Sequence, residues 1–433
     1  MEHKKAIVTI LLTSMMMVNI AFLPRANASN YLKVIWSGET LFTVDPTFTY
    51  YEPEIKKNIT IYYTPADEWP SVMATRDNQI WVAWQSEVPP ENPLKFEIVY
   101  KVFNGNWGNM TQLTNNASVD VKTPAIIQTL DNKIWIFWEA NETGNYDIFY
   151  KTTSDGGATW SNEIKVTNDS RRDSSPALTV TSDGKLWLVW SRQVNLTTYQ
   201  ENIFYKTYNG ATWSNETQLT TVNAIDQLPS ITQTKDGKVW VFWSRNMTNV
   251  YNIFYKIYNG TAWSGDSQLT TDTKYINFDP TAFVERDGTL WLFWELKSTQ
   301  ISSNYNLYYK TYNGTWWPTQ QFTNDNSNEN EPTATITPDQ SMWVIWTSDR
   351  VDPNSNPNID LYLRRSMLGD VNKDGWIDNN DLSIIAKALA TDSSMLPYGT
   401  GWNQYNPNCD LNADNKINII DLSIAALNFG QHM

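Results

Sequence analysis

A short tryptophan-rich segment recurs six times along this chain, and its spacing limits the possible folds more than any other feature of the sequence. The copies are 51 to 54 residues apart, and their first tryptophans are Trp81, Trp135, Trp187, Trp240, Trp291 and Trp343. A proline lies eleven residues before each of them, at Pro70, Pro124, Pro176, Pro229, Pro280 and Pro332. A period near 50 residues predicts an array of similar supersecondary units.

Each unit reads as four strands. The segment after the proline, such as 124–129 (PAIIQT), is the first strand, and an Asp-Gly or Asp-Asn pair then predicts a tight hairpin. The tryptophan-rich segment is the second strand, and its continuous apolar run indicates burial on both faces. Segments such as 147–151 (DIFYK) are third strands, and segments that end in QLT, KVT or QFT are fourth strands.

A sheet with two apolar faces must be covered on both sides. Six such sheets arranged radially cover one another, which is the β-propeller solution, and indole rings fill the space between the blades. We therefore predict a mainly β fold, with a closed six-bladed β-propeller over residues 29–366. The last unit lacks a fourth strand, and we expect residues 58–63 (NITIYY) to complete the sixth blade and close the ring.

The turn between the third and fourth strands carries a family resemblance. Residues 153–160 read TSDGGATW, which resembles the Asp-box of sialidase-like (BNR-repeat) propellers, and eroded copies begin at residues 103, 208, 258 and 312. In that family the box is a structural turn, so the resemblance implies that Asp155 bonds to turn amides and that Trp160 packs inward. The arginine triad, the Tyr–Glu pair and the Phe/Tyr-Arg-Ile-Pro motif of sialidases are not found, so the box implies a fold and not an activity.

We expect the functional face of the propeller to lie opposite the Asp-Gly hairpins. There, polar residues follow the tryptophan strands or precede the prolines, where the acids include Asp67, Glu68, Asp173 and Glu331. The candidate catalytic carboxylates for acid/base glycoside hydrolysis are Glu139, Glu295, Asp226 and Asp279, and the candidate ligand-binding residues are Arg192 and Arg245. The same residues also suit a solvated acidic rim in which the arginines bridge neighbouring blades, so ligand binding, catalysis and a structural role all stay open.

Two twelve-residue loops near the C-terminus predict calcium sites. Residues 370–381 and 410–421 place oxygen-bearing side chains at alternate positions, which suits a hard cation, and a short helix follows each loop. We expect two Ca²⁺ ions, with ligands from Asp370, Asn372, Asp374, the Trp376 carbonyl, Asp378 and Asp381, and from Asp410, Asn412, Asp414, the Lys416 carbonyl, Asn418 and Asp421. The alternative is a pair of acidic loops without metal.

The duplicated loop and helix, with Asp at the last loop position, resemble a type I dockerin domain over residues 368–430. Such a domain is small, α-helical and EF-hand-like, and the resemblance implies a cohesin-like protein as partner. A module that only stabilises or anchors the chain is the alternative.

The two loops are expected to differ in calcium affinity. The first loop carries four aspartates and the second carries three, and more ligand charge favours tighter binding. Calorimetric titration of the full chain with Ca²⁺ should therefore resolve two sites, and Asp370→Asn should remove the tighter one. Two equal sites, or no binding, would contradict this expectation.

The N-terminal residues predict export. Lys4 and Lys5 precede an apolar run, and Ala26-Asn27-Ala28 follows it, which is the layout of a secretory signal peptide over residues 1–28. An uncleaved membrane anchor is the alternative, and no later stretch is long and apolar enough to span a bilayer. The ten Asn-X-Ser/Thr sequons that follow residue 28 fit an exported glycoprotein, although chance also explains them in a chain rich in Asn and Thr.

The composition argues against some functions, and two hypotheses for the function remain. The net charge of −14 argues against nucleic acid as a partner, and the two histidines lie at the chain ends, which excludes histidine-based catalysis in the propeller. Our first hypothesis is a secreted or cell-surface protein that binds a glycan or a surface partner and is attached through its calcium module. Our second is an extracellular, sialidase-like glycoside hydrolase that acts in polysaccharide degradation.

Overall fold

The structure is a computed structural model that describes residues 40–43, 47–52, 57–62, 66–88, 95–116, 119–142, 144–195, 197, 199–246, 250–285, 288–299, 304–338, 341–350, 359–366, 379–389, 391–392, 409 and 416–427. The chain divides into two compact units, Trp36–Met367, which we call the six-sheet unit, and a unit that includes Leu368–Met433. The predicted signal peptide lies outside the described residues. The described part is mainly β with two short helices, as the sequence predicts.

The described strands of the six-sheet unit form six antiparallel, four-stranded arrangements that follow the sequence repeat. The first three sheets are β4 (Asp67–Ala74), β5 (Ile80–Val88), β6 (Lys95–Phe103) and β7 (Thr111–Gln112); β8 (Val121–Gln128), β9 (Ile134–Ala140), β10 (Asp147–Thr153) and β11 (Ile164–Lys165); and β12 (Asp173–Val180), β13 (Leu186–Asn195), β14 (Gln200–Tyr208) and β15 (Thr217–Gln218).

The remaining three sheets have the same strand order. They are β16 (Ile225–Gln233), β17 (Val239–Asn246), β18 (Tyr251–Tyr258) and β19 (Ser267–Gln268); β20 (Tyr275–Val284), β21 (Leu290–Ser298), β22 (Asn306–Tyr312) and β23 (Gln320–Gln321); and β24 (Glu329–Ile336), β25 (Met342–Ser348), β26 (Asp360–Arg365) and β1 (Thr40–Leu41). One parallel pair, Glu201 with Ile225, also joins the third sheet to the fourth.

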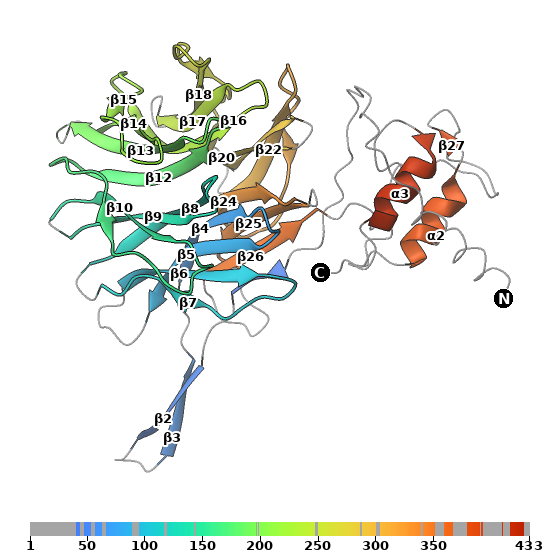
Figure 1. The fold of residues 1–433 in the computed structure, drawn as a ribbon, viewed down its shortest axis with the longest axis horizontal. Coiled ribbons are helices and arrows are strands. Elements are labelled where there is room, and N and C mark those ends of the chain that lie inside the picture. The colour runs from blue at the N-terminus through green and yellow to red at the C-terminus, as the bar shows by residue number, and fades with distance from the viewer. Residues whose placement is uncertain are drawn as a thin grey trace. The chain divides into compact units, whose positions relative to one another are not determined.

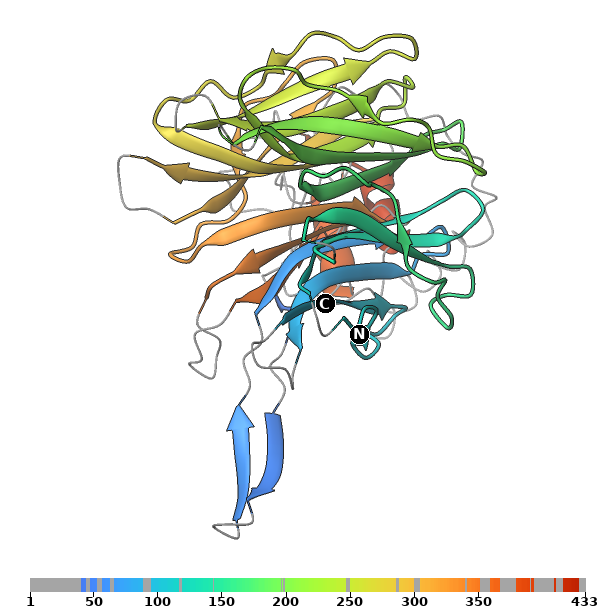
Figure 2. The same cartoon turned by 90° about the vertical axis from the view of Figure 1, so that its left-hand side faces the viewer.

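The strand that completes the sixth sheet is not the predicted one. β1 pairs with β26, whereas β3 (Lys57–Tyr62) pairs with β2 (Thr47–Glu52) in a separate hairpin (Figure 2). The assignment of residues 58–63 to the sixth sheet is therefore wrong.

The physical reason is a pair of hydrogen bonds to the third strand of the sheet. Residues 41–43 (LFT) make this pair in the sixth sheet, and the segments QLT, KVT or QFT make it in the other sheets. The Phe42 N–H donates to the Leu361 carbonyl at 2.8 Å, and the Leu361 N–H donates to Thr43 Oγ1 at 3.1 Å. In the fifth sheet, the Phe322 N–H donates to the Leu307 carbonyl at 2.8 Å, and Thr323 Oγ1 accepts from the Leu307 N–H at 2.8 Å.

The paired tryptophans explain how the sheets are held together. Because side chains alternate along a strand, tryptophans three residues apart face opposite sides of their sheet. The first tryptophan of one sheet therefore shares an apolar cluster with the second tryptophan of the next: Trp81 with Trp138, Trp135 with Trp190, Trp187 with Trp243, Trp240 with Trp294, and Trp343 with Trp84. The last pair lies between the sixth sheet and the first.

The innermost strands β4, β8, β12, β16, β20 and β24 are neighbours in that order, and β24 also contacts β4 (Figure 1). The hydroxyl of Thr333 accepts from the Val72 N–H at 3.2 Å, and that of Thr335 accepts from the Ala74 N–H at 3.3 Å. The first and the last sheet of the repeat therefore pack side by side.

The Asp-box turn lies between β10 and β11 and behaves as the resemblance implies. Asp155 Oδ1 accepts from the Thr159 N–H at 2.9 Å, and Trp160 packs against the apolar cluster between the first two sheets. These contacts confirm a structural role for the box.

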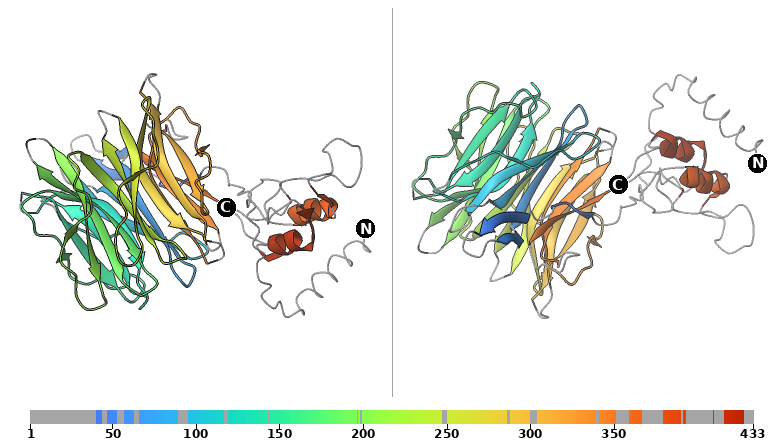
Figure 3. Two further views of the ribbon diagram at one scale, coloured as in Figure 1. Left: turned by 90° about the horizontal axis from the view of Figure 1, so that it is seen from above. Right: turned by 90° about the horizontal axis from the view of Figure 1, so that it is seen from below.

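The C-terminal unit contains α2 (Asn379–Ala388) and α3 (Ile419–Leu427), which lie side by side (Figure 3). A short ladder joins β27 (Thr391–Asp392) to β28 (Lys416–Ile417). Their buried cluster includes Ile385, Ile417 and Cys409. No helix in the described part of the chain combines the length and the apolar character that crossing a membrane requires.

Candidate functional site

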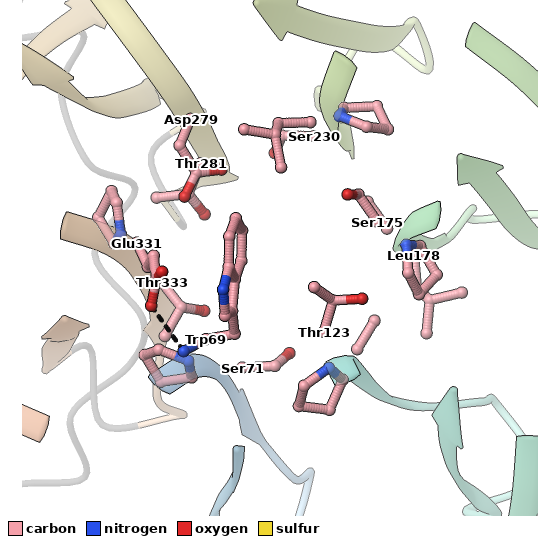
Figure 4. A pocket seen from close by; sticks show the side chains of 18 of the residues that line it. Trp69, Ser71, Thr123, Ser175, Leu178, Ser230, Asp279, Thr281, Glu331 and Thr333 are labelled. Atoms are coloured by element: carbon pink, nitrogen blue, oxygen red, sulfur yellow. Dashed lines mark hydrogen bonds between the residues drawn. The ribbon is translucent and has the colours of Figure 1, made fainter. Parts of the chain in front are cut away.

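The six innermost strands surround a pocket of about 180 Å³ (Figure 4), which we call the axial pocket. Each strand contributes its repeated proline and the residue on either side of it. The residue just before the proline differs in every sheet: Trp69, Thr123, Ser175, Leu228, Asp279 and Glu331. A regular scaffold therefore presents six different side chains around one axis.

The backbone at these six positions is strained. Their φ angles lie between 47° and 55°, which non-glycine residues seldom adopt, and the strand register shifts at the same point in each sheet. Such residues cost about 1–3 kcal/mol each and persist where the surroundings hold them.

Hydrogen bonds between sheets hold five of these residues in place. The N–H groups donate to side chains at the end of the preceding tryptophan strand: Thr123 to Gln85 (3.0 Å), Ser175 to Glu139 (2.8 Å), Leu228 to Ser191 (3.1 Å), Asp279 to Ser244 (3.0 Å) and Glu331 to Glu295 (2.6 Å). Glu139 and Glu295, two of the candidate catalytic carboxylates, are thus bridges between neighbouring sheets.

Glu139 is one of these bridges and does not line the axial pocket. Its carboxylate is 2% exposed, accepts the Ser175 N–H, and receives Arg172 Nη2 at 3.3 Å. Burial raises the pKa of Glu139, and the Arg172 charge opposes that rise. A catalytic role for Glu139 stays a prediction, and its contacts support a structural role.

Arg192, Arg245 and Asp226 are buried inside single sheets, and none of them lines the pocket. Arg192 Nε lies 2.6 Å from Asp173, and Arg245 Nε lies 2.6 Å from Asp226. Each guanidinium also reaches a carboxylate near the outer edge of its sheet at 2.7 Å, Glu216 for Arg192 and Asp266 for Arg245. Ligand binding by the arginines and catalysis by Asp226 stay predictions.

The acidic side of the pocket brings together three carboxyl groups. Asp279 and Glu331 line the pocket, and Glu295, 4% exposed, holds the Glu331 N–H from behind. Glu331 Oε2 itself accepts from the Trp69 N–H at 2.7 Å and from Thr347 Oγ1 at 2.6 Å. Glu331 therefore both faces the pocket and joins the sixth sheet to the first.

The pKa values of these three carboxyl groups are raised. Burial raises the pKa of Glu331 to about 8, and the charges of Glu68 and Glu295 add to the rise. Burial and the Glu331 charge raise the pKa of Asp279 well above its usual range, and burial and the Asp279 charge do the same for Glu295. With a pKa of about 8, the Glu331 carboxyl group is mostly protonated at pH 7 and can donate a hydrogen bond.

Aromatic side chains complete this side of the site. The indole of Trp69 stands in the pocket beside Glu331 (Figure 4). Burial raises the pKa of Tyr305, and the charge of Glu295 adds to that rise, but Tyr305 does not line the pocket. The sequence analysis missed Trp69 and Tyr305. Trp69 could have been found as the only aromatic residue among the six positions before the prolines.

Glu331→Gln is expected to stabilise the fold at high pH. A carboxyl with a pKa of about 8 in the folded state, against 4.5 ordinarily, binds more protons folded than unfolded. Its contribution to stability is present below about pH 4.5 and is lost as the pH rises through 8. Glutamine keeps the acceptor for Trp69 and Thr347 and carries no charge, so we expect a gain of about 2–4 kcal/mol at pH 9 and little change at pH 4.5.

Urea midpoints of the two proteins from pH 4.5 to 9 measure this difference, and Asp183→Asn in an exposed hairpin is the control. Parallel pH profiles for wild type and Glu331→Gln would contradict the raised pKa.

The predicted calcium ligands fall mostly outside the described residues; Asp381, Lys416, Asn418 and Asp421 lie within them. Asp381 and Asp421 are fully buried in the first turns of α2 and α3, and Asp421 Oδ2 accepts the Asn418 N–H at 2.8 Å. Buried carboxylates are normally paired or bound to a metal, and an all-oxygen donor set suits Ca²⁺, so these residues fit the ion. Within the described residues, no three acidic, histidine or cysteine side chains form a ready metal cluster.

Comparison with known proteins supports both units. Residues 368–426 match the family model of the dockerin type I domain, and dockerin domains typically bind calcium. No curated protein matches the chain.

The six-sheet unit resembles solved β-propeller structures at low identity. A protein of unknown function from Dyadobacter fermentans has a TM-score of 0.57 and 12% identity, with 70% of this chain and 96% of that chain covered. An α-L-arabinanase of Penicillium chrysogenum complexed with arabinobiose has a TM-score of 0.52 and 13% identity, over 69% and 93%. A mutant NanB sialidase of Streptococcus pneumoniae has a TM-score of 0.53 and 10% identity, over 70% and 68%. This similarity establishes a propeller-like fold and no activity.

Proposed function

We propose that this chain is a secreted, closed six-bladed propeller that binds a saccharide in its axial pocket. One observation carries the proposal: the indole of Trp69 shares a cavity with the carboxyl groups of Asp279 and Glu331. A sugar ring offers an apolar face to an aromatic ring and hydroxyls to polar groups, and pockets that combine the two are the usual sites for such ligands.

The C-terminal dockerin domain attaches the propeller to a cohesin-type protein. Each of its two loops holds one Ca²⁺, with Asp381 and Asp421 fixing the last ligand position to the start of a helix. The fold similarity to an arabinanase crystallised with arabinobiose supports a saccharide as ligand, and the signal-like N-terminus supports an extracellular location.

A glycan array probed with the full chain tests the proposal. Trp69→Ala should weaken binding of every positive saccharide at least tenfold, because the aromatic face is lost. Trp317→Ala is the matched control, since Trp317 is a tryptophan 38% exposed that does not line the pocket. An array without positive saccharides, or equal binding by Trp69→Ala and wild type, would refute saccharide binding in the axial pocket.

Glycoside hydrolysis is the second candidate function. It is favoured by the presence of two carboxyl groups, Asp279 and Glu331, in the lining of one pocket, because glycoside hydrolysis uses a pair of carboxyl groups. If the chain is a hydrolase, Glu331→Gln and Asp279→Asn should each lower turnover of aryl glycosides by about 10²–10⁴-fold. Asp183→Asn in an exposed hairpin should leave turnover unchanged, and a lack of turnover on all glycosides would leave binding alone.

A further inference from the structure

Several buried carboxylates elsewhere in the six-sheet unit are matched by cations. The described ion pairs include Asp173 with Arg192, Asp226 with Arg245, Glu329 with Arg350, Glu139 with Arg172, and Asp147 with Lys165. In each pair the carboxylate is at most 2% exposed. These five acids therefore have a positive partner that offsets the cost of burying a charge, whereas buried Asp67 forms no described ion pair and accepts a hydrogen bond from Trp84.

The axial pocket breaks this pattern. In the described part of the chain, no lysine or arginine forms an ion pair with Asp279, Glu295 or Glu331, and none lines the pocket. The described lysine closest in sequence, Lys297, lies over the ring of Tyr305 at 4.9 Å. These carboxyl groups are therefore neutralised either by protons or by a positive charge on the ligand.

The indole of Trp69 favours the second possibility. An aromatic face attracts a cation, and the attraction grows when the pair is shielded from water. The backbone N–H of Trp69 donates to Glu331 Oε2 at 2.7 Å, so the main chain that carries the indole is held beside this carboxyl group. The cavity of about 180 Å³ leaves room for a group of the size of one sugar ring.

We propose that the group bound in the axial pocket carries a protonated amine, so that the saccharide recognised is an amino sugar. This inference rests on the proposed saccharide binding and adds its chemical class. The ammonium replaces protons on Asp279 and Glu331 and lies against the indole of Trp69. We expect anionic sugars to bind more weakly, because their charge would meet the two carboxyl groups that line the pocket and, among the described residues, no cation.

Calorimetry with three trisaccharides tests the inference on the full chain at pH 7. The glucosamine trimer carries the amine, its N-acetylated form has the same ring without the charge, and the glucose trimer has a hydroxyl in its place. We expect the glucosamine trimer to bind at least tenfold more tightly than either neutral trimer. In the double variant Asp279→Asn/Glu331→Gln this preference should disappear, whereas Asp183→Asn should preserve it.

The outcomes separate the two proposals. Binding of a neutral trimer as tightly as the glucosamine trimer, with loss in Trp69→Ala, would overturn the amine and leave saccharide binding in place. If the double variant still prefers the glucosamine trimer, the inference is also overturned, because residues other than Asp279 and Glu331 would then recognise the amine. Failure of all three trimers, together with a negative glycan array, would overturn both.

Discussion

Arg192→Met is expected to destabilise the six-sheet unit by about 3–5 kcal/mol, because it leaves Asp173 buried without its cation. Asp173 is fully buried, and Arg192 Nε and Nη2 reach its two oxygens at 2.6 and 2.7 Å. Burial already raises the pKa of Asp173, and the guanidinium is what opposes the rise. The loss should appear as a lower urea midpoint measured by tryptophan fluorescence.

The second sheet supplies the matched control for this change. In the third sheet, Asp173 pairs with Arg192 on the neighbouring strand. The equivalent pair in the second sheet is Val121 with Ala140. There the indole N–H of Trp138 has no partner among the described residues, whereas that of Trp190 donates to Asp173 at 2.8 Å. The double variant Asp173→Val/Arg192→Ala copies the apolar version of the same site.

We expect the double variant to recover most of the stability that Arg192→Met loses. The remaining deficit should be about 1–3 kcal/mol, for the indole N–H left without an acceptor. If the double variant is as unstable as the single one, the buried charge is not the cause of the loss.

Phe42→Ala is expected to cost about 3–5 kcal/mol, the usual effect of deleting a buried aromatic ring. Phe42 is 7% exposed and makes edge contacts with Trp84 at 5.6 Å and Trp107 at 4.7 Å, both in the first sheet. Its own strand belongs to the sixth sheet, so the ring fills the space where the first and last sheets meet. Deletion of residues 29–45 should have a larger effect, because it also uncovers the edge of β26.

Replacing residues 46–63 by a flexible Gly-Ser linker is the control. This change removes the β2–β3 hairpin, which pairs with none of the six sheets, and should leave the urea midpoint within about 0.5 kcal/mol of wild type. A loss of folding in the linker variant, with Phe42→Ala neutral, would restore residues 58–63 as the closing strand.

The sequence repeat predicted the sheets and the role of the tryptophans because both depend on spacing alone. It did not identify the closing strand, since residues 41–43 share only a three-residue pattern with the other fourth strands. Residues 58–63 have stronger strand propensity, but β-propensity does not choose a partner. The hydrogen bonds that Phe42 and Thr43 make with Leu361 decide which strand pairs with β26.

The candidate site was predicted in part. Asp279 and Glu331 lie before prolines and line the pocket, whereas Asp173 and Asp226 lie only two residues further from theirs and are buried inside their sheets. A register shift between those positions turns the side chains in different directions, and a shift of this kind cannot be read from composition. In a regular repeat, the position whose residue type changes from copy to copy is a better indicator of the binding site than the overall composition.

The saccharide site is tested most directly by a crystal structure of the full chain grown with the sugar that binds best. We expect one sugar ring in the axial pocket, stacked on Trp69, with polar groups within hydrogen-bonding distance of Asp279 and Glu331. A sugar bound only on the outer strands or at the Asp-Gly hairpins, with none in the pocket, would contradict the assignment.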